Sequence, residues 1–238
     1  KIPRWIRLTG GGPGRAGNEP TAHILYLKHE RPEVYEETAM FLEPVDYLGF
    51  RLTGRMAASY DSITAHWVTD NRDLTNVAYD DQLIEWSELD RGRLPDLRPT
   101  NSILGPISGE AARELGLNAD VQVVIGTGDV HSAAVGSGAV GDFEGHLYIG
   151  TSSWLTYHVP YKRTDLLRSI ATIPSAIPGR YLVADEQESA GACLTFLRDN
   201  VFFADDELTT GRPDDAYAAF DRVAAQAPPG SDKVIFTP

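Results

Sequence analysis

The segment Val121-Gln-Val-Val-Ile-Gly-Thr-Gly-Asp129 indicates the fold class of this chain. Its β-branched run predicts a short strand, and Gly126 and Gly128 mark the turn where that strand ends. Residues 131–140 are mostly small, and they predict a helix that packs very closely on its neighbours, because glycine costs about 1 kcal/mol relative to alanine in a helix. A strand that passes through a glycine turn into a helix is typical of α/β proteins.

Asp129 is the acidic side chain at this turn, and two interpretations of it compete. At the carboxyl end of a strand, next to Gly126 and Gly128, its carboxylate could contact a substrate or phosphate that approaches the backbone closely. Alternatively, Asp129 caps the following helix, a common role for Asp that contributes about 1 kcal/mol. The local pattern favours neither interpretation.

Upstream of this segment, residues 1–65 are predicted to be mostly helical, with a glycine-rich loop over residues 9–17. That loop contains no Gly-Lys-Ser/Thr and follows no strand, so it is not interpreted as a phosphate-binding P-loop. Apolar residues at helical spacing, with proline near the starts and glycine or proline near the ends, predict helices over residues 22–28, from 32 onward, over 45–52, 57–64 and 79–89.

From residue 97 onward, strands and helices are both expected. The predicted strands lie within residues 101–107, 121–125, 146–149, 154–159, 180–184 and 234–236, and the predicted helices within 109–115, 190–203 and 214–226. Glycine and acidic residues cluster near residues 139–145, where we expect the division between two domains, residues 1–139 and 140–238.

Gly150-Thr-Ser-Ser153 forms the expected turn of a β-hairpin. Its backbone N–H and hydroxyl groups could donate hydrogen bonds to a phosphate. The same composition is more often only a turn, so this segment by itself is a weak indication of a site.

Composition narrows the classes of function. Hydrophobic residues make up 42% and charged residues 23%, as in a globular protein. The formal net charge of -13 disfavours a nucleic-acid partner. The single cysteine, Cys193, fits a reducing cytoplasmic setting, and no apolar stretch approaches the roughly 20 residues that cross a membrane. Histidine spacing suggests no metal site, and no Gly-x-Ser-x-Gly supports a serine hydrolase.

Five segments in order resemble the FGGY family of carbohydrate kinases, which includes xylulokinase and glycerol kinase. They are Ala22–Tyr35, Phe41–Gly54, Val124–Gly138, Tyr148–Ser153 and Gln187–Asp199. The resemblance implies an RNase H-like fold of the actin and hexokinase type, with parts of two domains flanking an ATP cleft. Ordered agreement of five segments is far more specific than any one of them.

The resemblance implies ATP-dependent phosphorylation of a sugar or polyol hydroxyl, with a xylulose-like substrate favoured and Mg²⁺ bound with ATP. Asp129 would be the general base, would contact the substrate together with Val130, and would approach the metal of Mg-ATP. Gly150, Thr151 and Ser152 would bind ATP phosphates. Val130 stands where many xylulokinase-like members carry Asn, which puts pentulose specificity in doubt.

The family's first phosphate-binding hairpin and its glycine-rich adenosine motif are absent from this sequence. The chain also begins without Met and ends within an expected strand, so a fragment that is inactive in isolation is expected. The alternative is a non-catalytic binding module of the same fold, which associates with another copy, as in a homodimer, through an unpaired sheet edge.

Overall fold

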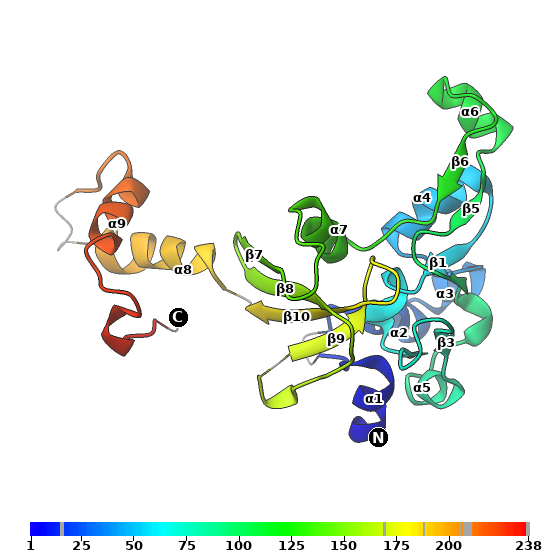
Figure 1. The fold of residues 1–238 in the computed structure, drawn as a ribbon, viewed down its shortest axis with the longest axis horizontal. Coiled ribbons are helices and arrows are strands. Elements are labelled where there is room, and N and C mark those ends of the chain that lie inside the picture. The colour runs from blue at the N-terminus through cyan, green and yellow to red at the C-terminus, as the bar shows by residue number, and fades with distance from the viewer. Residues whose placement is uncertain (15–16, 169, 188, 205, 207–210, 237–238) are drawn as a thin grey trace. The chain divides into compact units, whose positions relative to one another are not determined.

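The computed structural model describes residues 1–14, 17–168, 170–187, 189–204, 206 and 211–236 (Figure 1). The chain divides into two compact units. The first comprises Lys1–His146 with Thr156–Asp185, and the second comprises Leu147–Leu155 with Glu186–Pro238. The expected division between residues 139 and 140 stays a prediction.

The chain is mixed α/β, as predicted. Up to residue 98 the elements are α1 (Ile2–Thr9), α2 (Pro20–Glu30), α3 (Pro32–Glu37), α4 (Pro44–Thr53), β1 (Ala57–Ser59), the 3-10 helix η1 (Ser62–His66), β2 (Thr69–Asp70), β3 (Ala78–Tyr79), α5 (Asp81–Trp86), the 3-10 helix η2 (Arg91–Arg93) and β4 (Asp96–Arg98). The helices predicted over residues 22–28, from 32, over 45–52 and within 79–89 are therefore present. Gly54 ends α4 with a φ of 75°, the left-handed conformation that favours glycine.

The remaining elements are β5 (Ile103–Pro106), α6 (Gly109–Leu115), β6 (Gln122–Val124), α7 (Asp129–Gly136), β7 (Gly145–Ile149), β8 (Ser153–Val159), the 3-10 helix η3 (Leu166–Arg168), β9 (Ile170–Pro174), β10 (Tyr181–Gln187), α8 (Gly191–Phe196), the π-helix η4 (Leu197–Phe202), α9 (Ala216–Ala224) and the 3-10 helix η5 (Ser231–Lys233). The predicted hairpin is thus formed by β7 and β8, which are neighbours in the sheet.

Strand pairing joins distant parts of the chain. β1 pairs in parallel with β4, β2 and β3 pair antiparallel, and β5 pairs antiparallel with β6. The largest sheet has the order β7-β8-β10-β9, with β10 antiparallel to β9.

The main apolar core of the first unit lies among its N-terminal helices and short strands. Its buried members are Leu8, Ile24, Tyr35, Val68, Leu83, Ile84, Leu89 and Leu94. A smaller cluster of Ala57, Leu104 and Ile125 brings together β1, β5 and the residue that follows β6. This second cluster supports the turn that leads to Asp129.

Two expectations about secondary structure were wrong, and one stretch agrees with its prediction. Ala57–Ser59 is a strand rather than helix, because it pairs with β4, a partner that local periodicity does not reveal. The predominantly helical character predicted for residues 1–65 includes residues 2–9, which form helix α1 and end at Gly10 with a φ of 88°. Residues 234–236 form no strand, since none of the described strands pairs with them, and Ile235 is 82% exposed.

Within the part of the chain that the structure describes, no helix is long and apolar enough to cross a membrane.

Candidate active site

Asp129 is the first residue of α7, and Gly128 is the N-cap. Of the two competing interpretations, the one in which Asp129 caps this helix does not hold, because Gly128 is the residue with the extended conformation that precedes the first turn (φ -63°, ψ 159°). The side chain of Asp129 is exposed, and its Oδ1 accepts a hydrogen bond from the N–H of Val130 at 2.8 Å. Among the described residues, no other donor contacts this carboxylate, so it is accessible to a ligand.

A buried carboxylate, Asp61, holds the turn immediately before Asp129. Its Oδ2 accepts hydrogen bonds from the hydroxyl of Thr127 and, at 3.3 Å, from the N–H of Gly128. Its Oδ1 accepts from the hydroxyl of Thr100 at 2.6 Å. Asp61 is only 1% exposed, so these donors replace the water that a buried carboxylate would lose. The sequence analysis did not identify this residue, which lies 68 positions before Asp129.

Asp46 lies in a second buried polar group beside the segment that contains Asp61. The hydroxyl of Ser62 donates to both carboxylate oxygens of Asp46 at 3.0 Å. Burial raises the pKa of Asp46 to about 7, although the hydrogen bond from Ser62 opposes this shift. Asp46 thus connects α4 to η1, the element that follows Asp61.

Packing around the Gly126 backbone differs from the expectation of a close ligand approach. A Cβ at Gly126 would lie 2.0 Å from Cγ2 of Val45, so the missing side chain makes room for α4.

His131 is 3% exposed and contacts the carbonyl of Pro174 through Nε2 at 2.9 Å, which joins α7 to β9. The close packing predicted for the small-residue helix holds at buried Ala134 but not at Gly136, which faces open space.

In the second unit, Gly150 and Thr151 line a pocket of about 450 Å³. The turn is closed by a hydrogen bond from the N–H of Gly150 to the carbonyl of Ser152 at 2.8 Å. Within the described residues, no acceptor contacts the hydroxyls of Thr151 and Ser152, so both can donate to a ligand. Ser152 is not among the lining residues, in contrast to the other two predicted phosphate contacts.

The start of α8 forms the other side of this pocket and was not assigned to the site by sequence. The N–H of Gly191 donates to the carbonyl of Gly150 at 2.7 Å, and the N–H of Ala190 donates to the carbonyl of Thr151 at 2.8 Å. A Cβ at Gly191 would lie 2.5 Å from the Gly150 oxygen, so this approach requires glycine. The remaining lining residues are Ala192, Leu194, Thr195 and Tyr217. The run Ser189–Ala192, which spans the start of the helix, was the available sequence signal.

The predicted residues therefore form two groups. Asp129 and Val130 lie at the start of α7 in the first unit, and Gly150–Ser152 lie in the turn between β7 and β8 in the second. No three His, Cys, Asp or Glu side chains come together as a metal site among the described residues. An exposed carboxylate such as Asp129 is nevertheless compatible with Mg²⁺, which usually takes one or two carboxylates together with water and substrate phosphates.

Comparison with known proteins identifies the family. Residues 15–136 match the family described as "FGGY family of carbohydrate kinases, N-terminal domain". The chain belongs to the FGGY family. FGGY relatives include the autoinducer-2 kinase of Klebsiella pneumoniae, which is 29% identical over 213 residues, 89% of this chain and 39% of that protein. The autoinducer-2 kinase of Salmonella paratyphi A is 27% identical over the same lengths.

Solved structures show the same FGGY kinase fold. The xylulose kinase of Rhodospirillum rubrum matches with a TM-score of 0.80 and 21% identity, over 97% of this chain and 45% of that protein. The xylulose kinase of Lactobacillus acidophilus matches with a TM-score of 0.78 and 23% identity, over 98% of this chain and 44% of that protein. The RNase H-like fold of the actin and hexokinase type is thus confirmed. The chain spans 39% of the length of these autoinducer-2 kinases.

Proposed function

We propose that this chain is part of an ATP-dependent carbohydrate kinase in which Asp129 is the general base. The observation that carries this proposal is the accessible carboxylate of Asp129 at the start of α7, on a turn that buried Asp61 fixes through Thr127 and Gly128. A catalytic base needs an accessible carboxylate whose position does not depend on a flexible backbone. Membership in the FGGY family supports the same assignment.

In the proposed reaction, a hydroxyl oxygen of a sugar or polyol attacks the γ-phosphorus of ATP. Asp129 accepts the hydroxyl proton as the new P–O bond forms, and the bond between the γ-phosphorus and the bridging oxygen breaks to release ADP. Phosphoryl transfer relies mainly on positioning and charge neutralisation. Asp129 would therefore act chiefly by holding and orienting the attacking hydroxyl.

The proposed phosphate contacts are Gly150, Thr151 and Ser152. Two of them line the pocket beside α8, and the hydroxyls of Thr151 and Ser152 are unoccupied by described acceptors. Hydroxyl and backbone donors in a tight turn can hold phosphate oxygens without a basic side chain. Such donors suit an acidic protein, whose net charge is -13.

Mg²⁺ bound with ATP would neutralise charge on the phosphates, and Asp129 is the residue of this chain proposed to approach it. We favour a xylulose-like substrate. Val130 is partly exposed beside Asp129. Its apolar side chain stands where many xylulokinase-like members carry the amide of an Asn, so it would influence which sugar is accepted.

The whole protein provides the test, because this chain spans only part of the length of its relatives. ATP turnover is measured with xylulose, other pentuloses, hexuloses, gluconate, glycerol and autoinducer-2. Asp129→Asn keeps the size of the side chain but removes the basic oxygen, so it should abolish transfer while ATP still binds. Asp120→Asn, a change of the same charge in the exposed loop before β6, is the control. Retained turnover in Asp129→Asn would exclude the proposed base.

The isolated chain is proposed to be inactive, since much of the length of its relatives lies outside it. Robust ATP-dependent turnover by the 238 residues alone would contradict this.

A non-catalytic, self-associating module is the second candidate. β7 is an edge of its four-stranded sheet, and its Leu147 and Ile149 are 62% and 68% exposed. An exposed apolar edge strand favours pairing with another chain. Light scattering tests the proposed homodimer, and a monomer at all concentrations would exclude it. A cytoplasmic location is proposed with either function, tested by fractionation of cells that express the protein.

A further inference from the structure

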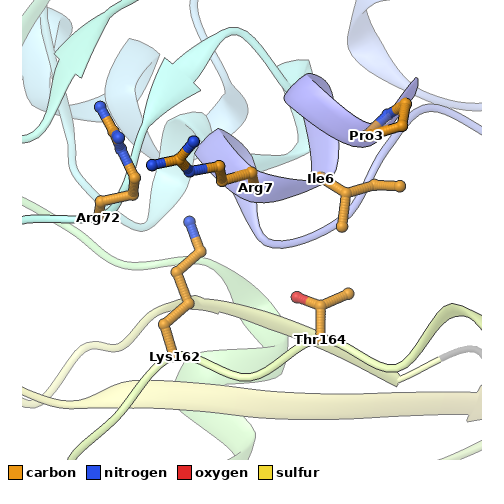
Figure 2. Close-up of a pocket in the computed structure, with 6 residues that line it drawn as sticks. All are labelled: Pro3, Ile6, Arg7, Arg72, Lys162 and Thr164. Carbon is orange, nitrogen blue, oxygen red and sulfur yellow. The ribbon is translucent and has the colours of Figure 1, made fainter. Parts of the chain in front are cut away.

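A pocket of about 450 Å³ in the first unit brings together three basic side chains from three separate segments. Arg7 comes from α1, Arg72 from the residues after β2, and Lys162 from the residues after β8. Figure 2 shows the ammonium end of Lys162 directed toward the guanidinium group of Arg7. Pro3, Ile6 and Thr164 complete the lining.

The backbone around this pocket is fixed by hydrogen bonds at the end of α1. The carbonyl of Leu8 accepts from the N–H of Asn71 at 2.8 Å and from the ammonium group of Lys162. The carbonyl of Gly10 accepts from the hydroxyl of Thr164 at 2.7 Å. These bonds join the same three segments that carry the basic side chains. The fold therefore holds together the three segments that carry the positive charges.

Acidic partners do not balance this positive charge. Asp70 forms an ion pair with Arg72, with oxygen to nitrogen distances of 2.7 and 2.9 Å. No carboxylate of the described residues lies within ion-pair distance of Arg7 or Lys162. Such an excess of positive charge is unusual in a chain whose net charge is -13. Like charges that the fold holds together repel, and a bound anion would remove that repulsion.

Lys162 is also partly withdrawn from water. Burial lowers the pKa of its ammonium group to about 8, and Asp70 opposes this shift while Arg72 reinforces it. A desolvated cation interacts more strongly with an anion than a fully hydrated one, because the local dielectric constant is lower. Next to the basic groups, the side chains of Pro3 and Ile6 add an apolar wall. The pocket thus combines anion-binding groups with a surface suited to carbon atoms.

We propose that this pocket binds a phosphate monoester of a small organic molecule, with Arg7 and Lys162 as the principal phosphate ligands. The guanidinium group of Arg7 can donate two parallel hydrogen bonds to phosphate oxygens, and Lys162 adds a compact positive charge. The proposal does not depend on the kinase reaction, because it involves neither Asp129 nor the turn at Gly150. It gives the protein a second ligand site, separate from the proposed catalytic residues.

Calorimetric titration of the full chain at pH 7 and constant ionic strength tests this site. The probes are inorganic phosphate and ribose 5-phosphate, and both should bind, the ester more tightly because of the apolar wall. Arg7→Gln should weaken both affinities about tenfold or more, as expected for loss of a charged hydrogen-bonding group. Arg113→Gln removes the same charge from an exposed position on α6 and should leave both affinities unchanged.

Arg7 is the decisive position, because no described residue accepts a hydrogen bond from it and its replacement should leave the fold intact. If Arg7→Gln binds both probes as the unmodified chain does, the phosphate binds elsewhere and the proposal is wrong. Equal losses in Arg7→Gln and Arg113→Gln would show a non-specific effect of charge and also overturn it. Equal affinities for the two probes would show that the apolar wall contributes nothing and would overturn the preference for an ester over free phosphate.

A pH series gives a second readout of the same pocket. The second pKa of a phosphate monoester is about 6, so the charge of the ligand is nearly constant above pH 7. Arg7, Arg72 and Asp70 face Lys162, and the pKa of Asp70 is lowered while that of Arg72 is raised. Affinity should therefore fall between pH 7 and 9 as Lys162 loses its proton. Lys162→Met, checked for intact folding by thermal unfolding, should bind weakly with little pH dependence. A pH-independent affinity in the unmodified chain would exclude Lys162 as a ligand.

Discussion

The buried carboxylate of Asp61 accepts a hydrogen bond from the N–H of Gly128 at 3.3 Å, one residue before the proposed base. The same carboxylate accepts from the hydroxyls of Thr127 and Thr100. Asp61 therefore determines where α7 begins and where Asp129 lies. Its role is to position the turn, since Asp129 and not Asp61 carries the accessible carboxylate.

We predict that Asp61→Ala lowers the free energy of unfolding by about 1–3 kcal/mol, because one buried and two partly buried donors lose their acceptor. Urea unfolding measures the loss, and Asp120→Ala in an exposed loop should change stability much less. A double-mutant cycle of Asp61→Asn with Thr127→Val should give a clear interaction energy. Additive effects of these two changes would contradict the proposed coupling.

We predict that Gly126→Ala destabilises the first unit by about 1–3 kcal/mol, because the new methyl group would overlap Cγ2 of Val45. Val45→Ala in the same chain should recover part of the loss by making room for it. Gly12→Ala is the control, because a Cβ there meets no atom within 4 Å. Thermal unfolding is measured for the unmodified chain, Gly126→Ala, the double variant with Val45→Ala, and Gly12→Ala. Equal stabilities of Gly126→Ala and Gly12→Ala would rule out the overlap.

The raised pKa of Asp46 predicts a specific pH dependence of stability. Its folded-state pKa of about 7 exceeds the ordinary value of 3.8, so the folded chain binds this proton more tightly than the unfolded chain. The resulting stabilisation is complete below about pH 4 and is lost as the pH rises to about 7. Asp46→Asn should therefore gain stability relative to the unmodified chain between pH 5 and 8. Denaturant unfolding at pH 5 and at pH 8 measures the free energy of unfolding of both proteins. The same difference between Asp46→Asn and the unmodified chain at the two pH values would contradict the prediction.

The close contact between Gly191 and the carbonyl of Gly150 makes a prediction for nucleotide binding. In Gly191→Ala the added carbon would lie 2.5 Å from that oxygen, so α8 must move away from the turn. ATP affinity of the whole protein should fall about tenfold, as for the loss of a charge-assisted hydrogen bond. Ala192→Gly, at the neighbouring lining position, creates no overlap and is the control. Unchanged ATP affinity in Gly191→Ala would place the nucleotide elsewhere.

Local sequence patterns determined much of this protein. Helical spacing with Pro44 and Gly54 specified α4, and two strand-like runs on either side of Gly150–Ser153 specified the hairpin of β7 and β8. The order of such segments also identified the FGGY family and placed Asp129 after a strand. These features depend on residues close together in the chain. They therefore appear in the sequence as the spacing of apolar residues and as proline or glycine at the ends of elements.

Only the tertiary structure decided which distant residues meet. Ala57–Ser59 became a strand because β4 pairs with it, and Asp61 became the support of the turn because its burial requires donors from Thr100, Thr127 and Gly128. The basic pocket likewise joins residues 7, 72 and 162, which share no sequence pattern. Hydrogen-bond satisfaction and charge balance in a folded chain depend on distances in space, and these are not encoded at any fixed spacing in the sequence.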